Sequence, residues 1–230
     1  MKNEQLTPED LLGPMNQVER KYAPAELFIA GDADLCRNFA KVAVIGTRQV
    51  STIGIKRTQE LVRLLVERGV VIVSGLALGV DACAHEAAIK NGGKTIAVLG
   101  TPIDQFYPRE NAELQRIIMK DYLALSQFKS GVPVQKKNFP IRNRTMALIS
   151  HATVIIEAGE GSGTLHQGWE ALRLGRPLFL LESITKRNDL KWPAEMIGYG
   201  AQVLSRGGLE DLFELLPHGK SGVHAAALSF

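Results

Sequence analysis

Short apolar runs alternate with amphipathic segments along most of this chain. The runs at 42–45, 70–73 and 152–156 contain no polar residue except Thr153, and each precedes a segment with apolar residues at helical spacing. Strands that are apolar on both faces are typical of parallel sheets covered by helices on both sides. The pattern therefore predicts a doubly wound α/β domain with a mostly parallel, Rossmann-like sheet and helices on both faces.

The same pattern predicts the domain limits. Residues 1–25 are expected to be an N-terminal lead-in containing a short helix, with Thr7 as N-cap and Pro8 in the first helical position. Residues 26–216 form the Rossmann-like domain and 217–230 a loose tail. Strands are expected at 26–30, 42–45, 70–73, 95–99, 122–125, 152–156 and 177–181, and helices at 54–68, 80–90, 111–120, 142–150, 164–174 and 207–216.

Composition limits the functional classes. The chain has 230 residues, of which 45% are hydrophobic, so it can bury a sizeable core. A net charge of +3 permits an anionic partner without requiring one. Two cysteines imply no disulfide framework, and no apolar run is long enough to span a membrane or to act as a signal peptide. We expect a cytoplasmic protein without a membrane partner.

Glycine-rich turns follow three of the predicted strands. They are 46–48, 74–81 and 157–164, and Arg48 ends the first. Each could be a tight turn with no ligand, but parallel strands bring such turns to one sheet edge, where backbone N–H groups suit phosphates. The turns fit neither the G-x-G-x-x-G fingerprint nor a P-loop. The sequence therefore predicts an anion-binding cleft without NAD, ATP or another cofactor.

The segment 136–144 places four cations around an aromatic residue. Pro140 is expected to keep Phe139 extended, so that a helix begins near Arg142. Cations at a helix N-terminus favour phosphate binding, and an extended Phe139 could stack on a base. The alternative is a solvated basic loop with Phe139 in the core.

Other candidate catalytic groups carry less weight. Asp81 and His85 share a helical face and could act as an acid–base pair, although a cap and a packed histidine are the favoured interpretation. No histidine or cysteine pattern has metal-ligand spacing, and Ser74 and Ser162 have no recognisable base partner.

Several motifs together resemble one known family. In order they are Gly46-Thr47-Arg48; Ser74-Gly75-Leu76-Ala77 with Gly79-Val80-Asp81 and Ala84-His85; Gly92-Gly93 with Ala97-Val98-Leu99-Gly100, Tyr107-Pro108 and Asn111; Asn138-Phe139-Pro140 with Arg142-Asn143-Arg144; and Glu157-Ala158-Gly159 with Ser162-Gly163. Over residues 26–183 the chain is similar to the DNA-processing protein A family (DprA, also called Smf).

The resemblance implies sequence-independent binding of single-stranded DNA, a homodimer, and loading of a RecA-type recombinase in natural transformation. Carried over by position, it assigns DNA contacts to Arg48, Lys137, Phe139, Arg142, Asn143 and Arg144, and backbone-type phosphate contacts to Ser74, Gly75, Ser162 and Gly163. Three features depart from the family: the short chain, the segment 164–170, and Leu181-Glu182-Ser183 in place of a Pro-Gly turn. A reduced member could instead serve a mobile element or an antiphage module.

A second resemblance supports an alternative function. Gly161-Ser162-Gly163-Thr164 is similar to the turn of the "lonely guy" nucleoside-monophosphate phosphoribohydrolases. Those enzymes place a glutamate three residues after the glycine of their G-T pair, where this chain has His166. A nucleotide sensor or phosphoribohydrolase would use the same cleft, with Glu157, Glu170 and Arg173 facing a ribose 5′-phosphate.

Overall fold

The computed structural model describes residues 4–217, and they form a nine-stranded sheet in the order β1-β2-β6-β5-β4-β3-β7-β8-β9. β1 pairs antiparallel with β2 and β2 antiparallel with β6, whereas the other neighbours are parallel. The expected mostly parallel, doubly wound sheet is confirmed. The strands are β1 (Glu4–Leu6), β2 (Leu27–Gly31), β3 (Lys41–Ile45), β4 (Val71–Ser74), β5 (Thr95–Leu99), β6 (Leu123–Ser126), β7 (Ala152–Ile155), β8 (Leu178–Leu181) and β9 (Gln202–Leu204).

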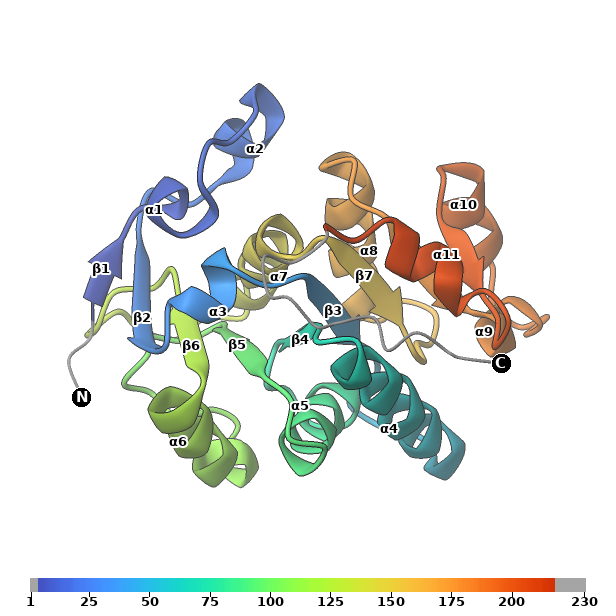
Figure 1. Ribbon diagram of the computed structural model, residues 1–230, viewed down its shortest axis with the longest axis horizontal. Coiled ribbons are helices and arrows are strands. Elements are labelled where there is room, and N and C mark those ends of the chain that lie inside the picture. Colours follow the sequence, from blue (N-terminus) through green and yellow to red (C-terminus); the bar gives the residue numbers. More distant parts are fainter. Residues whose placement is uncertain (1–3, 218–230) are drawn as a thin grey trace, which may run out of the picture.

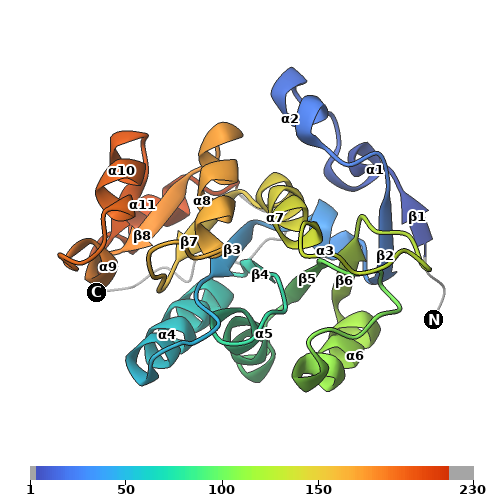
Figure 2. The same ribbon diagram turned by 180° about the vertical axis from the view of Figure 1, so that it is seen from behind.

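Helices cover both faces of this sheet. In Figures 1 and 2, α4, α5 and α6 lie on one side, and α7 and α8 on the other. All residues of the central strands β3, β4, β5 and β7 are buried, as their apolar sequences predict. The helices are α1 (Pro8–Leu12), α2 (Gln17–Tyr22), α3 (Asp34–Arg37), α4 (Thr52–Glu67), α5 (Val80–Lys90), α6 (Ala112–Asp121), α7 (Asn138–Ile149), α8 (Thr164–Arg173), α9 (Glu182–Thr185), α10 (Trp192–Gly198) and α11 (Leu209–Glu214), with a 3-10 turn η1 (Arg109–Asn111).

The direction of the chain across the sheet reverses beside β3. From β3 the chain proceeds to β4, β5 and β6 on one side, and it then returns to β7 on the other side of β3 before reaching β8 and β9. The carboxyl ends of β4, β3 and β7 therefore lie next to one another. In open α/β sheets this reversal is where ligands bind, because the loops on either side diverge.

Two segments differ from the sequence-based expectation. The expected lead-in contributes an edge strand, since Gln5 pairs with Phe28, and Leu11 of α1 is buried in the core. The N-cap at Thr7 is confirmed, because its side chain and that of Asp10 form a capping box. The expected tail lies outside the described residues from 218 onward.

The second difference concerns the start of α7. This helix begins at Asn138, so the expectation of an extended Phe139 and a helix from Arg142 is wrong. Pro140 stands in the first turn, where the missing N–H would have no intrahelical partner and where the fixed φ suits a helix. The earlier start determines which side chains of the basic segment share a face.

Candidate functional site

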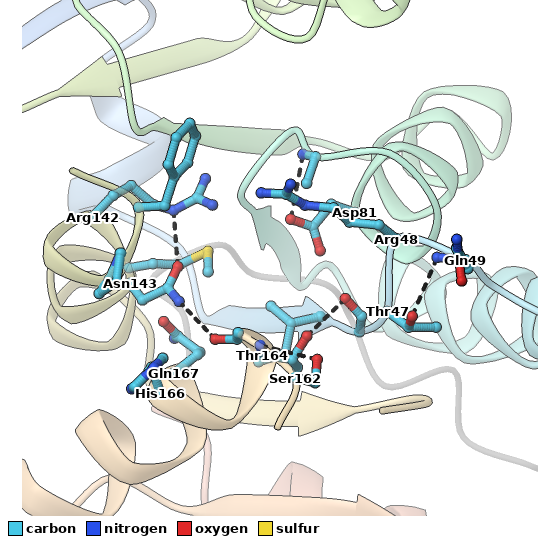
Figure 3. A pocket seen from close by; sticks show the side chains of 17 residues that line it. Thr47, Arg48, Gln49, Asp81, Arg142, Asn143, Ser162, Thr164, His166 and Gln167 are labelled. Atoms are coloured by element: carbon cyan, nitrogen blue, oxygen red, sulfur yellow. Dashed lines mark hydrogen bonds between the residues drawn. The ribbon is translucent and has the colours of Figure 1, made fainter. Parts of the chain in front are cut away.

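A cavity of about 520 Å³ opens at the carboxyl ends of β3, β4 and β7. It lies at the reversal point of the sheet, and we call it the switch-point cleft. The three glycine-containing turns meet there, as the sequence predicted, and the N-terminal half of α7 forms another wall. The cleft is lined by Ile45, Gly46, Thr47, Arg48, Gln49, Ala77, Asp81, Phe139, Pro140, Arg142, Asn143, Met146, Ser162, Gly163, Thr164, His166 and Gln167, of which ten are labelled in Figure 3.

Hydrogen bonds between the turns fix the walls of the cleft. The backbone N–H of Thr47 donates to the carbonyl of Glu157 at 2.7 Å, and the Thr164 hydroxyl donates to the carbonyl of Gly46 at 2.8 Å. A Cβ at Gly46 would lie 2.5 Å from a methyl group of Val80, so only glycine lets the turns approach this closely. The cleft is thus held in shape before any ligand binds.

The charges around the cleft favour an anion. First-turn residues of α7 and α8 line it, which directs the positive ends of two helix dipoles toward the cavity. Arg48 is exposed and forms no ion pair within residues 4–217. Asp81 is the one carboxylate among the described lining residues. Burial raises the pKa of Asp81, and the Arg142 guanidinium opposes that rise.

Arg142 is buried and serves the framework of the cleft. Its Nη1 donates to the carbonyl of Gly75 and, at 2.7 Å, to that of Val98, while its Nε donates to Oδ1 of Asn143 at 3.0 Å. These bonds tie α7 to the ends of β4 and β5. The side chain lines the cleft, and most of its donors are used inside the protein, which favours a positioning role; its direct contact with DNA stays a prediction.

Ser74 and Gly75 also have partners inside the protein. The Ser74 hydroxyl is fully buried and donates to the carbonyl of Val44 at 2.7 Å, so it is not available to a phosphate. A Cβ at Gly75 would lie 2.3 Å from Nη1 of Arg142, which explains the need for glycine there. Gly75 thus makes room for the guanidinium of Arg142 and accepts a hydrogen bond from it, whereas Ser74 is bonded to β3.

The remaining cations of the basic segment point in different directions. Arg144 pairs with Glu170 at 3.3 Å and lies 5.3 Å from the ring centroid of Tyr22, away from the residues that line the cleft. Lys137 is exposed immediately before α7 and also does not line the cleft. Arg144 is therefore engaged with α8 and α2, while Lys137 stays available at the end of the helix.

Besides Arg48 and Arg142, four predicted contact residues line the cleft, namely Phe139, Asn143, Ser162 and Gly163. Asn143 donates from Nδ2 to the carbonyl of Gly163 at 3.3 Å, which ties α7 to the turn before α8. Ser162 accepts the N–H of Thr164 at 3.3 Å. Phe139 is half-buried and lies between the cleft and the turns after β4 and β5, with its ring centroid 5.7 Å from the Arg48 guanidinium carbon. Figure 3 shows Arg142 and Asn143 facing Arg48 and Asp81 across the cavity.

Sequence reasoning missed several residues that line the cleft. Met146 follows Phe139, Arg142 and Asn143 on α7 at helical spacing, and a helix starting at Asn138 would have identified it. Thr47 and Thr164 belong to turns that were recognised, and Gln49 directly follows the first of them, although the side chains of these three residues were not assigned. Gln167 lies three residues after Thr164 on α8, so the same periodicity would have found it.

The alternative catalytic groups are not assembled at the cleft. His85 is fully buried, its Nδ1 lies 2.6 Å from the Thr95 hydroxyl, and burial lowers its pKa to about 3, so the interpretation as a packed histidine holds. Glu170 is held by Arg144 and Arg173 instead of lining the cleft. The Glu157 carboxylate accepts the Ser51 hydroxyl at 2.8 Å outside the cleft.

Two features are absent from residues 4–217. No three acidic, histidine or cysteine side chains within this range come together as a metal site. No helix there combines the length and the apolar character needed to cross a bilayer.

Known proteins resemble this chain in sequence and in fold. DNA processing protein DprA of Streptococcus pneumoniae is 45% identical over 159 residues, which cover 69% of this chain and 56% of the relative. The X-ray structure of that protein matches with a TM-score of 0.81 and 35% identity, over 95% of this chain and 76% of the other. DNA processing protein A of Helicobacter pylori, whose structure concerns its single-stranded DNA binding mode, matches at 0.77 and 30% identity, over 92% and 96% of the chains.

The chain thus spans little more than half the length of the pneumococcal relative, and about half of several other curated relatives. The model of one family, described as DNA recombination-mediator protein A, matches residues 5–217, almost the whole described range. That match and the shared fold agree with the motifs found in the sequence. The chain belongs to the DNA recombination-mediator protein A family.

Proposed function

We propose that this protein binds single-stranded DNA without sequence preference, with the phosphate backbone in the switch-point cleft. The observation that carries the proposal is the exposed Arg48, which has no ion-pair partner in the described part of the chain and lies beside the ring of Phe139, at a cleft lined by two helix N-termini. Contacts to phosphate fix the register of a strand but carry no base information, which accounts for binding without sequence preference. The Helicobacter pylori relative with a single-stranded DNA binding mode supports the same assignment.

Within this proposal, the predicted contact residues divide into two groups. Arg48 and Lys137 are exposed cations that contact the phosphate backbone of the DNA. Phe139, Ser162 and Gly163 lie close enough to the cavity or its rim to contact the DNA strand. Ser74, Gly75, Arg142, Asn143 and Arg144 act through the framework that positions the first group.

We also propose the biological context. Membership of a recombination-mediator family supports a role in DNA processing during recombination or natural transformation, in the cytoplasm, with a RecA-type recombinase as partner and a homodimer as the working form. Deleting the gene for this protein should therefore lower the number of transformants. Normal transformation together with increased phage sensitivity would instead point to an antiphage module.

The test of binding is fluorescence anisotropy with a labelled oligothymidine over a salt series, compared with a duplex of equal length. We expect salt-dependent binding that prefers the single strand. Arg48→Ala and Lys137→Ala should each weaken binding and each reduce the slope of log K against log salt by about 0.7, the value for one lost phosphate contact on a single strand.

Lys120→Ala provides a matched control for the loss of one positive charge. Lys120 is exposed near the end of α6, just before β6 begins. It therefore lies near the amino end of a strand, whereas the cleft lies at the carboxyl ends of the parallel strands. Its removal should leave the slope unchanged. The proposal is wrong if the protein binds no single-stranded DNA at low salt, or if all three variants behave alike.

A further inference from the structure

A second, smaller cavity of about 70 Å³ adjoins the switch-point cleft on the other side of Phe139. The two cavities share Arg48, Ala77, Phe139 and Arg142, but the smaller one is otherwise lined by apolar side chains and glycines. Leu78 and Tyr107 form its outer rim. We call this cavity, with Leu78, Tyr107 and Phe139, the aromatic subsite.

Tyr107 is an exposed aromatic residue at the rim of this cavity. Its side chain is 46% exposed, although its ring lies 5.6 Å from the Phe139 centroid at an interplanar angle of 45°. Its hydroxyl forms no hydrogen bond with the rest of residues 4–217. Leu78, on the turn after β4, is 37% exposed beside it. An aromatic ring and an aliphatic side chain exposed together present an apolar surface without an internal partner.

The position of Arg48 connects this surface to the phosphate site. Arg48 lines both cavities, and its guanidinium lies against the ring of Phe139. A nucleotide carries an anionic phosphate and a planar apolar base on one sugar, so a cation between a polar cavity and an aromatic surface can serve both parts. The cavity is too small to enclose a base, but stacking requires contact with only one face of it.

We propose that the aromatic subsite binds a nucleobase of a single strand whose phosphates lie in the switch-point cleft, and that Tyr107 supplies the ring on which the base stacks. This inference rests on the proposed function of the cleft. It adds a binding residue that lies outside the basic segment. Since every base has an aromatic face, such a subsite adds affinity without adding sequence preference.

The test compares two labelled oligonucleotides of equal length, an oligothymidine and a fully abasic sugar–phosphate strand. Tyr107→Ala should weaken binding of oligothymidine by about 5- to 150-fold, the range of one lost base–aromatic stack, and leave binding of the abasic strand unchanged. The salt slope should stay at the wild-type value for both strands, because no phosphate contact is removed.

Three further variants make the result specific. Tyr107→Phe keeps the ring and should restore affinity, whereas Tyr107→Leu keeps apolar volume without the ring and repeats the test if the alanine variant does not fold. Tyr199→Ala is the matched control, since Tyr199 is 71% exposed and packs on Trp169 of α8, away from both cavities. It should bind both strands as the wild type does.

The outcomes separate this inference from the proposed function. If the wild type binds neither strand, the proposed function fails and the subsite fails with it. If the wild type binds oligothymidine but Tyr107→Ala binds it equally well, the subsite is wrong and the proposed function stands. An equal loss of affinity for both strands would give Tyr107 a structural role and would also overturn the inference.

Discussion

Replacing Arg142 by methionine should unfold the cleft rather than merely remove a DNA contact. The change deletes hydrogen bonds to the carbonyls of Gly75 and Val98 and to the Asn143 side chain, all in the interior. It also leaves the buried Asp81 carboxylate without the guanidinium that lowers its pKa. Leaving a buried acceptor unpaired costs about 1–3 kcal/mol, and the change leaves three such acceptors, so a total of about 3–5 kcal/mol is a low estimate. At about 2–4 °C per kcal/mol for a domain of this size, Tm should fall by roughly 6–20 °C.

The assay is thermal and urea unfolding of the wild type, Arg142→Met, Asp81→Asn and the double variant. Because Asp81→Asn removes the uncompensated charge, the double variant should be more stable than Arg142→Met alone, which gives a favourable coupling energy between the two positions. The reasoning is refuted if Arg142→Met melts within about 2 °C of the wild type while losing its affinity for DNA. In that case the guanidinium would be a ligand contact with no framework role.

Three further predictions concern the surroundings of the cleft. Gly75→Ala should lower stability by about 1–3 kcal/mol because its Cβ would lie 2.3 Å from Nη1 of Arg142, whereas Gly159→Ala, with nothing within 4 Å, should not; urea unfolding distinguishes them. The pKa of buried His85 falls from 6.5 to about 3, so the unfolded chain binds more protons between these values and stability declines as pH falls through that window. His85→Gln should flatten this decline by up to about 1.4 kcal/mol per pH unit in unfolding experiments at several pH values. Glu170→Gln should release two arginines and tighten DNA binding at low salt, seen by anisotropy; unchanged affinity would mean that DNA does not reach α8.

Much of the fold followed from local patterns in the sequence. Strands such as β3 and helices such as α5 were predicted nearly to the residue, because a wholly apolar run and a glycine-terminated helix are strong local signals. β1 was missed because three residues at a sheet edge carry almost no pattern. Its pairing with β2 is a tertiary contact that local propensity does not encode.

The existence of the cleft could also be predicted, but the role of each side chain in it could not. Glycine turns after parallel strands necessarily meet at one edge, and this alone placed Arg48 and Ser162 together. Whether a hydroxyl or a guanidinium points toward solvent or into the protein depends on the neighbours it meets. Ser74 donates to the carbonyl of Val44, and Arg142 donates to the carbonyls of Gly75 and Val98. All three acceptors are far from their donors in sequence.

The start of α7 determines which cations of the basic segment face the cleft. With α7 beginning at Asn138, Phe139, Arg142, Asn143 and Met146 fall at i, i+3, i+4 and i+7, which is a single helical face, and they line the cleft together. Arg144 lies five residues after Phe139, about 140° around the helix from it, and so must point toward α8 and α2. Reading Pro140 as a stop placed Arg142 and Arg144 together in the first turn of a shorter helix, where both could reach a phosphate. A proline in the first helical turn instead fixes the face, and the exposed Arg48, supplied by a different strand, becomes the cation on which binding in the cleft should depend most.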